Sequence, residues 1–90
     1  MLKIDKSLRI CIVGLGYVGL PLAVEFGRKY NTVGFDIDKN RISQLNNGID
    51  ITREISKREL LSSKNLSITN NKEKIRNCNF YIITVPTPVD

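Results

Sequence analysis

One stretch constrains this chain more than any other, the ten residues from Ile10 to Gly19, which read ICIVGLGYVG. Four apolar residues predict a buried strand, and the Gly-x-Gly-x-x-Gly spacing after them is typical of a turn from a strand into a helix. In such a turn Gly14 permits the sharp change of direction, Gly16 lets the backbone approach a pyrophosphate, and Gly19 permits close helix packing. The free N–H groups at the helix start attract the anion. The stretch therefore predicts a dinucleotide-binding turn.

An acidic residue lies where the adenosine end of such a ligand is expected. A second apolar run, residues 32–35, is followed by Asp36, 22 positions after Gly14. A carboxylate roughly 20 residues along, at the carboxyl end of the next strand, holds the ribose hydroxyls. The alternative is that Asp36 only caps the following helix. A carboxylate there repels a 2′-phosphate, so we expect NAD rather than NADP, although Lys39 and Arg41 could accommodate a phosphate.

Composition places the chain among ordinary globular proteins. Its 90 residues, 41% hydrophobic and 26% charged, suffice for one small domain. The net charge of +5 is scattered, which indicates a solvated surface with a mild preference for anionic ligands and no nucleic-acid partner. We find no run of about 18 apolar residues and no secretory signal, so we expect no membrane span and a cytoplasmic location.

The chain contains no histidine, which excludes cysteine–histidine catalysis and histidine-ligated metal sites within it. We expect no metal site. The two cysteines, Cys11 in the first predicted strand and Cys78 before the last, are interpreted as core or near-core residues.

Strands and helices alternate along the chain after a polar lead-in at residues 1–7. The pattern predicts strands at about 8–13, 32–35, 66–69 and 80–85 and helices at about 18–29, 39–46, 57–63 and 72–77. Asp38 is the expected cap of the second helix, and residues 49–56 are expected to form a surface loop whose polar features are Thr52 and Glu54.

This alternation predicts an α/β fold, a Rossmann-like parallel sheet of order 3-2-1-4 with helices on both faces. The first and fourth strands are then neighbours, and the glycine turn and Pro86-Thr87-Pro88 border the crevice at their carboxyl ends. The chain stops five residues after Val85, which leaves the fourth strand as an apolar edge that could pair with another copy. We therefore expect residues 8–90 to be a truncated, partial domain of a longer protein.

Three segments carry a resemblance to a known family: GLGYVGLPLA at 14–23, GFDID at 34–38 with Arg41-Ile42 after it, and TVPTPVD at 84–90. Together they resemble the N-terminal NAD-binding domain of the nucleotide-sugar 6-dehydrogenases (the UDP-glucose/GDP-mannose dehydrogenase family). The ending is most similar to the branch acting on UDP-N-acetylhexosamines, including the Vi-polysaccharide type. The resemblance implies oxidation of the C6 alcohol of a UDP-sugar to a carboxylate in two hydride transfers to NAD, by way of a cysteine thiohemiacetal and thioester, for surface polysaccharide biosynthesis.

The resemblance also implies roles for eight residues in cofactor binding. By position, these are the phosphate turn Gly14, Gly16 and Gly19, the adjoining contacts Tyr17 and Val18, the ribose ligand Asp36, Arg41 at the adenine end, and Thr87 at the crevice. Arg41 has an alternative interpretation as an exposed helix residue, and Pro86-Thr87-Pro88 has one as a strand terminator.

The family's catalytic cysteine, lysine and asparagine belong to later domains and have no match here. We therefore expect this chain alone to bind NAD, at least in part, and to catalyse nothing, while the full-length parent binds the UDP-sugar through its other domains and forms a homodimer. The alternative from another class is a nucleotide-sensing regulatory module, because the same fold and glycines serve such domains.

Overall fold

A computed structural model describes residues 7–84, and the expectations for Thr87 and the rest of residues 85–90 lie outside that range. Four strands form one parallel sheet in the order β3-β2-β1-β4, as the sequence predicts. The strands are β1 (Arg9–Val13), β2 (Asn31–Phe35), β3 (Leu66–Thr69) and β4 (Phe80–Ile83).

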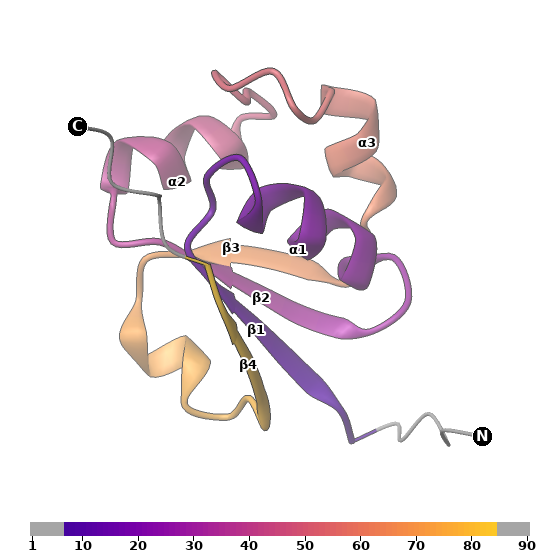
Figure 1. Ribbon diagram of the computed structural model, residues 1–90, viewed down its shortest axis with the longest axis vertical. Helices are drawn as coiled ribbons and strands as arrows, with labels where there is room; N and C mark the ends of the chain where they lie inside the picture. The colour runs from indigo at the N-terminus through magenta and orange to yellow at the C-terminus, as the bar shows by residue number, and fades with distance from the viewer. Residues whose placement is uncertain (1–6, 85–90) are drawn as a thin grey trace.

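Helices cover the two faces of this sheet unequally. The α-helices are α1 (Gly19–Gly27), α2 (Lys39–Asn46) and α3 (Lys57–Ser62), and the 3-10 helix η1 spans Lys72–Ile75. Figure 1 shows all three α-helices on one side of the sheet and η1 on the other. The expected two-sided arrangement is confirmed, with only a short 3-10 turn on the second face. Within residues 7–84, no helix has the length and apolar character needed to cross a membrane.

Alternation along β1 divides the core between the two faces. Ile10 and Ile12 are buried in the larger cluster, which also contains Leu20 and Val24 of α1. Cys11 points to the other face and packs in a smaller cluster that includes Cys78. Both cysteines are buried free thiols, as expected, and burial is the main reason that the pKa of Cys11 rises to about 11.

The short helix predicted at about residues 72–77 is present as the 3-10 helix η1, which ends two residues earlier than predicted. The chain has to reach the edge of β1 soon after η1, since the Asn79 N–H donates to the Arg9 carbonyl at 2.9 Å. The Asn79 side chain accepts from the Arg9 N–H at 2.9 Å as well. These two bonds begin the pairing of β4 with β1 and leave no length for a second helical turn.

The first helix ends at Gly27, two residues before the predicted end. The N–H groups of Arg28 and Lys29 donate to carbonyls three residues back, those of Glu25 and Phe26. This i to i−3 pattern is typical of a helix that tightens at its last turn.

Candidate functional site

The glycine turn lies at the carboxyl ends of the neighbouring strands β1 and β4, where the sequence places the crevice. Val13 of β1 pairs with Ile83 of β4, and Gly14 and Thr84 follow them directly. The Thr84 N–H donates to the Val13 carbonyl and its hydroxyl donates to the Gly14 carbonyl, both at 2.8 Å. Thr84 therefore fastens the end of β4 to the start of the turn.

The three glycines of the motif are required for different reasons. Gly14 has a φ of +98°, and a side chain at Gly14 or Gly19 would collide with the backbone oxygen of Thr84 or Gly14, respectively. At Gly16 a Cβ would meet no atom within 4 Å. The protein's own packing therefore explains Gly14 and Gly19, whereas the open space at Gly16 fits a ligand that approaches the backbone.

The start of α1 presents unpaired backbone donors. Its N-cap residue, Val18, makes no side-chain cap, whereas the side chains of Asp38 and Ser56 cap α2 and α3. Among residues 7–84, no hydrogen bond is donated by the backbone N–H groups of residues 16–19. Tyr17 and Val18 are 68% and 65% exposed. An uncapped helix start with accessible N–H groups is suited to binding an anion.

Asp36 is half-buried at the end of β2, beside the glycine turn. Its carboxylate accepts from the N–H groups of Leu15 and Asp38, both at 2.9 Å. A carboxylate has about four acceptor sites, so two remain for hydroxyl donors. The cap of α2 is Asp38, as expected, and the alternative that Asp36 serves only as that cap is wrong.

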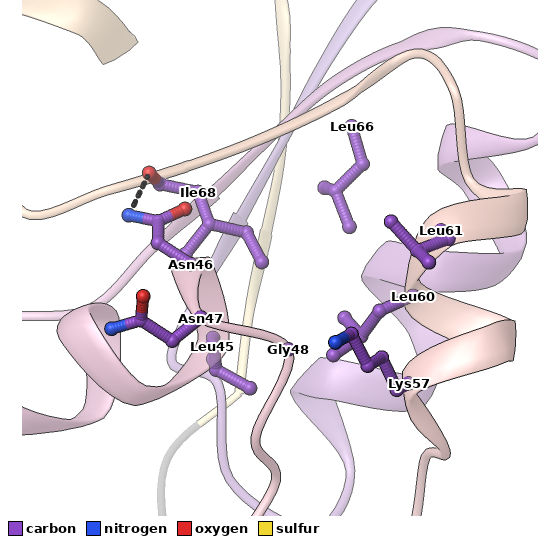
Figure 2. Close-up of a pocket in the computed structure, with 9 residues that line it drawn as sticks. All are labelled: Leu45, Asn46, Asn47, Gly48, Lys57, Leu60, Leu61, Leu66 and Ile68. Carbon is purple, nitrogen blue, oxygen red and sulfur yellow. Dashed lines mark hydrogen bonds between the residues drawn. The ribbon is translucent and has the colours of Figure 1, made fainter.

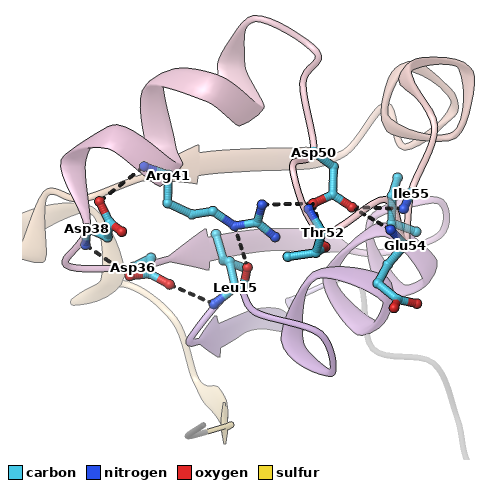
Figure 3. Close-up of polar contacts among 8 residues, drawn as sticks. All are labelled: Leu15, Asp36, Asp38, Arg41, Asp50, Thr52, Glu54 and Ile55. Atoms are coloured by element: carbon cyan, nitrogen blue, oxygen red, sulfur yellow. Dashed lines mark hydrogen bonds and ion pairs between the residues drawn. The ribbon is translucent and has the colours of Figure 1, made fainter.

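Arg41 is buried, which makes its interpretation as an exposed helix residue wrong. Its Nε donates to the Leu15 carbonyl at 2.7 Å, and its Nη1 donates to Asp50 at 2.8 Å. The remaining nitrogen, Nη2, has no partner among residues 7–84. The expected contact with the adenine end stays a prediction. Figure 3 shows how Arg41 lies between the glycine turn and the loop after α2.

A separate groove of about 410 Å³ lies between the end of α2, α3 and β3, away from the glycine turn. Figure 2 shows its mixed lining, in which the apolar residues are Leu45, Leu60, Leu61, Leu66 and Ile68 and the polar ones are Asn46, Asn47 and Lys57. This groove contains none of the predicted site residues. The candidate site is instead at the carboxyl ends of β1 and β2, where the glycine turn and Asp36 lie.

A strand that enters this kind of turn, with an acid at the end of the neighbouring strand, is the arrangement typical of dinucleotide-binding Rossmann domains. The comparison with known families narrows the class, because residues 8–90 match the UDP-glucose/GDP-mannose dehydrogenase family, NAD binding domain. The chain belongs to this family, and the part of the family that it matches is the domain that binds NAD.

Two curated relatives are closely similar in sequence. Over 90 residues the chain is 54% identical to UDP-N-acetyl-D-glucosamine 6-dehydrogenase of Salmonella typhi, covering 100% of this chain and 21% of the relative. Over 85 residues it is 54% identical to the Pseudomonas aeruginosa protein of the same name, covering 94% of this chain and 20% of the relative. The chain thus spans about a fifth of the length of these relatives.

Solved structures agree with the fold. The UDP-D-ManNAc dehydrogenase of Pyrococcus horikoshii superposes with a TM-score of 0.80 at 38% identity, over 92% of this chain and 21% of that one. A ternary complex of GDP-mannose dehydrogenase from Pseudomonas aeruginosa superposes with a TM-score of 0.77 at 28% identity, over 92% of this chain and 20% of that one.

Proposed function

We propose that this chain is the cofactor-binding part of a nucleotide-sugar 6-dehydrogenase, and that the whole protein oxidises the C6 alcohol of a UDP-N-acetylhexosamine to the carboxylate. The observation that carries the cofactor part is the open space at Gly16 beside unpaired N–H groups and Asp36. The similarity to UDP-N-acetyl-D-glucosamine 6-dehydrogenases supports the substrate class and favours an enzyme over a sensing module.

The pyrophosphate binds at the glycine turn in this proposal. The N–H groups of Gly16, Tyr17 and Val18 are unpaired within residues 7–84 and lie at the positive end of the α1 dipole. Asp36 uses its remaining acceptor sites for the adenosine ribose hydroxyls. Bound there, NAD would supply the hydride acceptor for the oxidation, while these residues of the chain would only bind and orient it.

The adenine end lies near Arg41 and Ile37. The Nη2 of Arg41 has no partner in the described part of the chain but is buried, so the exposed side chain at this end is that of Ile37. Ile37 follows Asp36 directly and is 79% exposed, so its side chain gives the adenine ring an apolar surface. Because Arg41 is already engaged by Asp50 and Leu15, it is a poor ligand for a 2′-phosphate, which supports NAD over NADP.

We assign no catalytic residue to this chain, and the contact of Thr87 with the cofactor at the crevice stays a prediction outside the described residues. Phe80, Tyr81 and Ile83 of β4 are exposed, and β4 has a single strand neighbour, β1, in the described range. This apolar edge is suited to burial by further parts of the protein or by a second copy of the chain. We keep the cytoplasm, where NAD is available, as the proposed compartment and a homodimer as the state of the whole enzyme.

Calorimetric titration of the 90-residue chain with NAD, NADP and UDP-N-acetyl-D-glucosamine tests this function. We expect saturable NAD binding that is at least about tenfold tighter than NADP binding, because Asp36 repels the 2′-phosphate. UDP-sugar binding without any response to NAD would contradict the proposed site.

A further inference from the structure

Asp50 lies in the loop between α2 and α3 and is held by an unusual number of hydrogen bonds. Its fully buried side chain accepts from the Thr52 N–H (3.0 Å) and hydroxyl (2.6 Å), the N–H groups of Glu54 and Ile55 (2.9 Å each), and Arg41 Nη1 (2.8 Å). Burial alone would raise its pKa, but the hydrogen bonds outweigh burial and lower the pKa from 3.8 to about 2. Asp50 is therefore charged at neutral pH.

One residue, Arg41, connects Asp50 to the glycine turn. Arg41 pairs with Asp50 through Nη1 and holds the Leu15 carbonyl through Nε at 2.7 Å (Figure 3). The two charged side chains are 8% and 0% exposed. A buried ion pair adds little net stability compared with an apolar pair of similar size. The consequence for the glycine turn is therefore the bond that the paired Arg41 makes to the Leu15 carbonyl.

The Arg41 bond fixes the orientation of a whole peptide group. The Leu15–Gly16 peptide is trans, so the Leu15 C=O and the Gly16 N–H point in opposite directions. Arg41 draws the carbonyl toward α2, which turns the Gly16 N–H away from Arg41. That N–H has no partner in the described part of the chain, and the space at Gly16 is open. The preceding peptide is fixed by the bond from the Leu15 N–H to Asp36.

We propose that Asp50 is a positioning residue of the cofactor site: through Arg41 it locks the Leu15–Gly16 peptide so that the Gly16 N–H faces the pyrophosphate before the cofactor arrives. This inference rests on the proposed NAD function. A donor that is oriented in advance saves the cost of ordering the turn on binding. The loop after α2, outside the glycine motif, thereby sets part of the cofactor affinity.

The lock can be observed in the unaltered chain without any ligand. NMR should show a slowly exchanging Arg41 Nε–H with a through-hydrogen-bond coupling to the Leu15 carbonyl carbon, at neutral pH. Rapid exchange of that Nε–H with no coupling would overturn the proposal. Because the measurement uses the unaltered chain, it does not depend on whether a substituted chain folds.

Substitutions then separate positioning from a merely structural role. Asp50→Asn and Arg41→Lys should each shift the Gly16 amide resonance in the NAD-free chain and raise the NAD dissociation constant about tenfold. Glu54→Gln removes an exposed carboxylate from the same loop and should do neither. Arg41→Lys keeps a cation for Asp50 but loses the fixed fork that reaches Leu15.

Two results distinguish this inference from the proposed function. If Asp50→Asn disturbs only the Thr52 and Ile55 amides and leaves Gly16 and the NAD affinity unchanged, Asp50 is no more than an anchor for its own loop and the inference fails. If the unaltered chain does not bind NAD, the proposed function fails for this chain, while the Gly16 resonance still decides whether the lock exists.

Discussion

The Leu15 N–H donates to Asp36 Oδ2 at 2.9 Å, so the middle of the glycine turn is tied to the acid at the end of the next strand. A backbone bond from the Gly14 N–H to the Phe35 carbonyl, at 2.8 Å, lies beside it. These two bonds fix the spacing between the pyrophosphate end and the ribose end of the proposed site. The chain's own hydrogen bonds therefore hold the two ends of the proposed site together.

Replacing glycines in the turn should separate ligand binding from folding. Gly16→Ala meets no atom within 4 Å, so we expect the free energy of unfolding to change by less than about 1 kcal/mol. The same methyl group occupies the space for the pyrophosphate and should weaken NAD binding at least about tenfold. Gly19→Ala, which collides with the Gly14 carbonyl, should cost about 3 kcal/mol in stability. Thermal melting and NAD titration check both; unchanged NAD affinity in Gly16→Ala would contradict the account.

Acid should destabilise the chain partly through Asp50. Its folded-state pKa of about 2 lies below the unfolded value of 3.8, so its contribution is complete above pH 3.8 and is lost as the pH falls toward 2. The shift corresponds to about 2 kcal/mol. Urea unfolding between pH 6 and pH 2.5 should show this loss in the unaltered chain, and Asp50→Asn should lack that part of the pH dependence. Parallel curves for the two proteins would argue against an ionised, buried Asp50.

The cap of α3 offers a stability test away from the cofactor site. Ser56 accepts from the Glu59 N–H at 3.1 Å, and the Glu59 side chain accepts from the Ser56 N–H at 3.1 Å. Ser56→Ala should lower the free energy of unfolding by about 1 kcal/mol. NAD affinity should not change, since neither residue contacts the glycine turn. A loss of NAD affinity in a folded Ser56→Ala chain would show that the site extends further than proposed.

The β4 edge should promote association of the isolated chain. Ile83 is 69% exposed at the end of β4, and a lysine there discourages edge pairing. Sedimentation velocity should show association that increases with concentration and decreases in Ile83→Lys. Leu61→Lys is the matched control, because Leu61 is 70% exposed on α3 and distant from that edge in sequence. Equal association of both variants would place the contact elsewhere.

Local patterns were sufficient for the fold and for the positions of the glycine turn and Asp36 in it. The strand order, the Asp38 cap and the position of Asp36 follow from apolar runs and short-range spacing. The short 3-10 helix η1 was not predictable in the same way, because its length depends on the bonds between Asn79 and Arg9, 70 residues apart in the chain.

The Arg41–Asp50 pair illustrates what a linear pattern leaves out. An aspartate two residues before Thr52 is a signal for a local turn, and that bond could have been predicted. The partners of Arg41 are 26 and 9 residues away in sequence, Leu15 and Asp50, and no periodicity links them. Burial of Arg41 therefore appears only when α2, the glycine turn and the following loop are packed together.

The central claim is that the glycine turn and Asp36 bind NAD, and an NMR titration that follows each backbone amide tests it most directly. We predict saturable shifts of the Gly16, Tyr17 and Val18 amides on addition of NAD. Asp36→Ala should raise the NAD dissociation constant at least about tenfold, because the ribose loses its acceptor. Glu73→Ala, on η1, should titrate like the unaltered chain. If NAD leaves these three amides unshifted, or if Asp36→Ala binds with unchanged affinity, the account of the site is wrong.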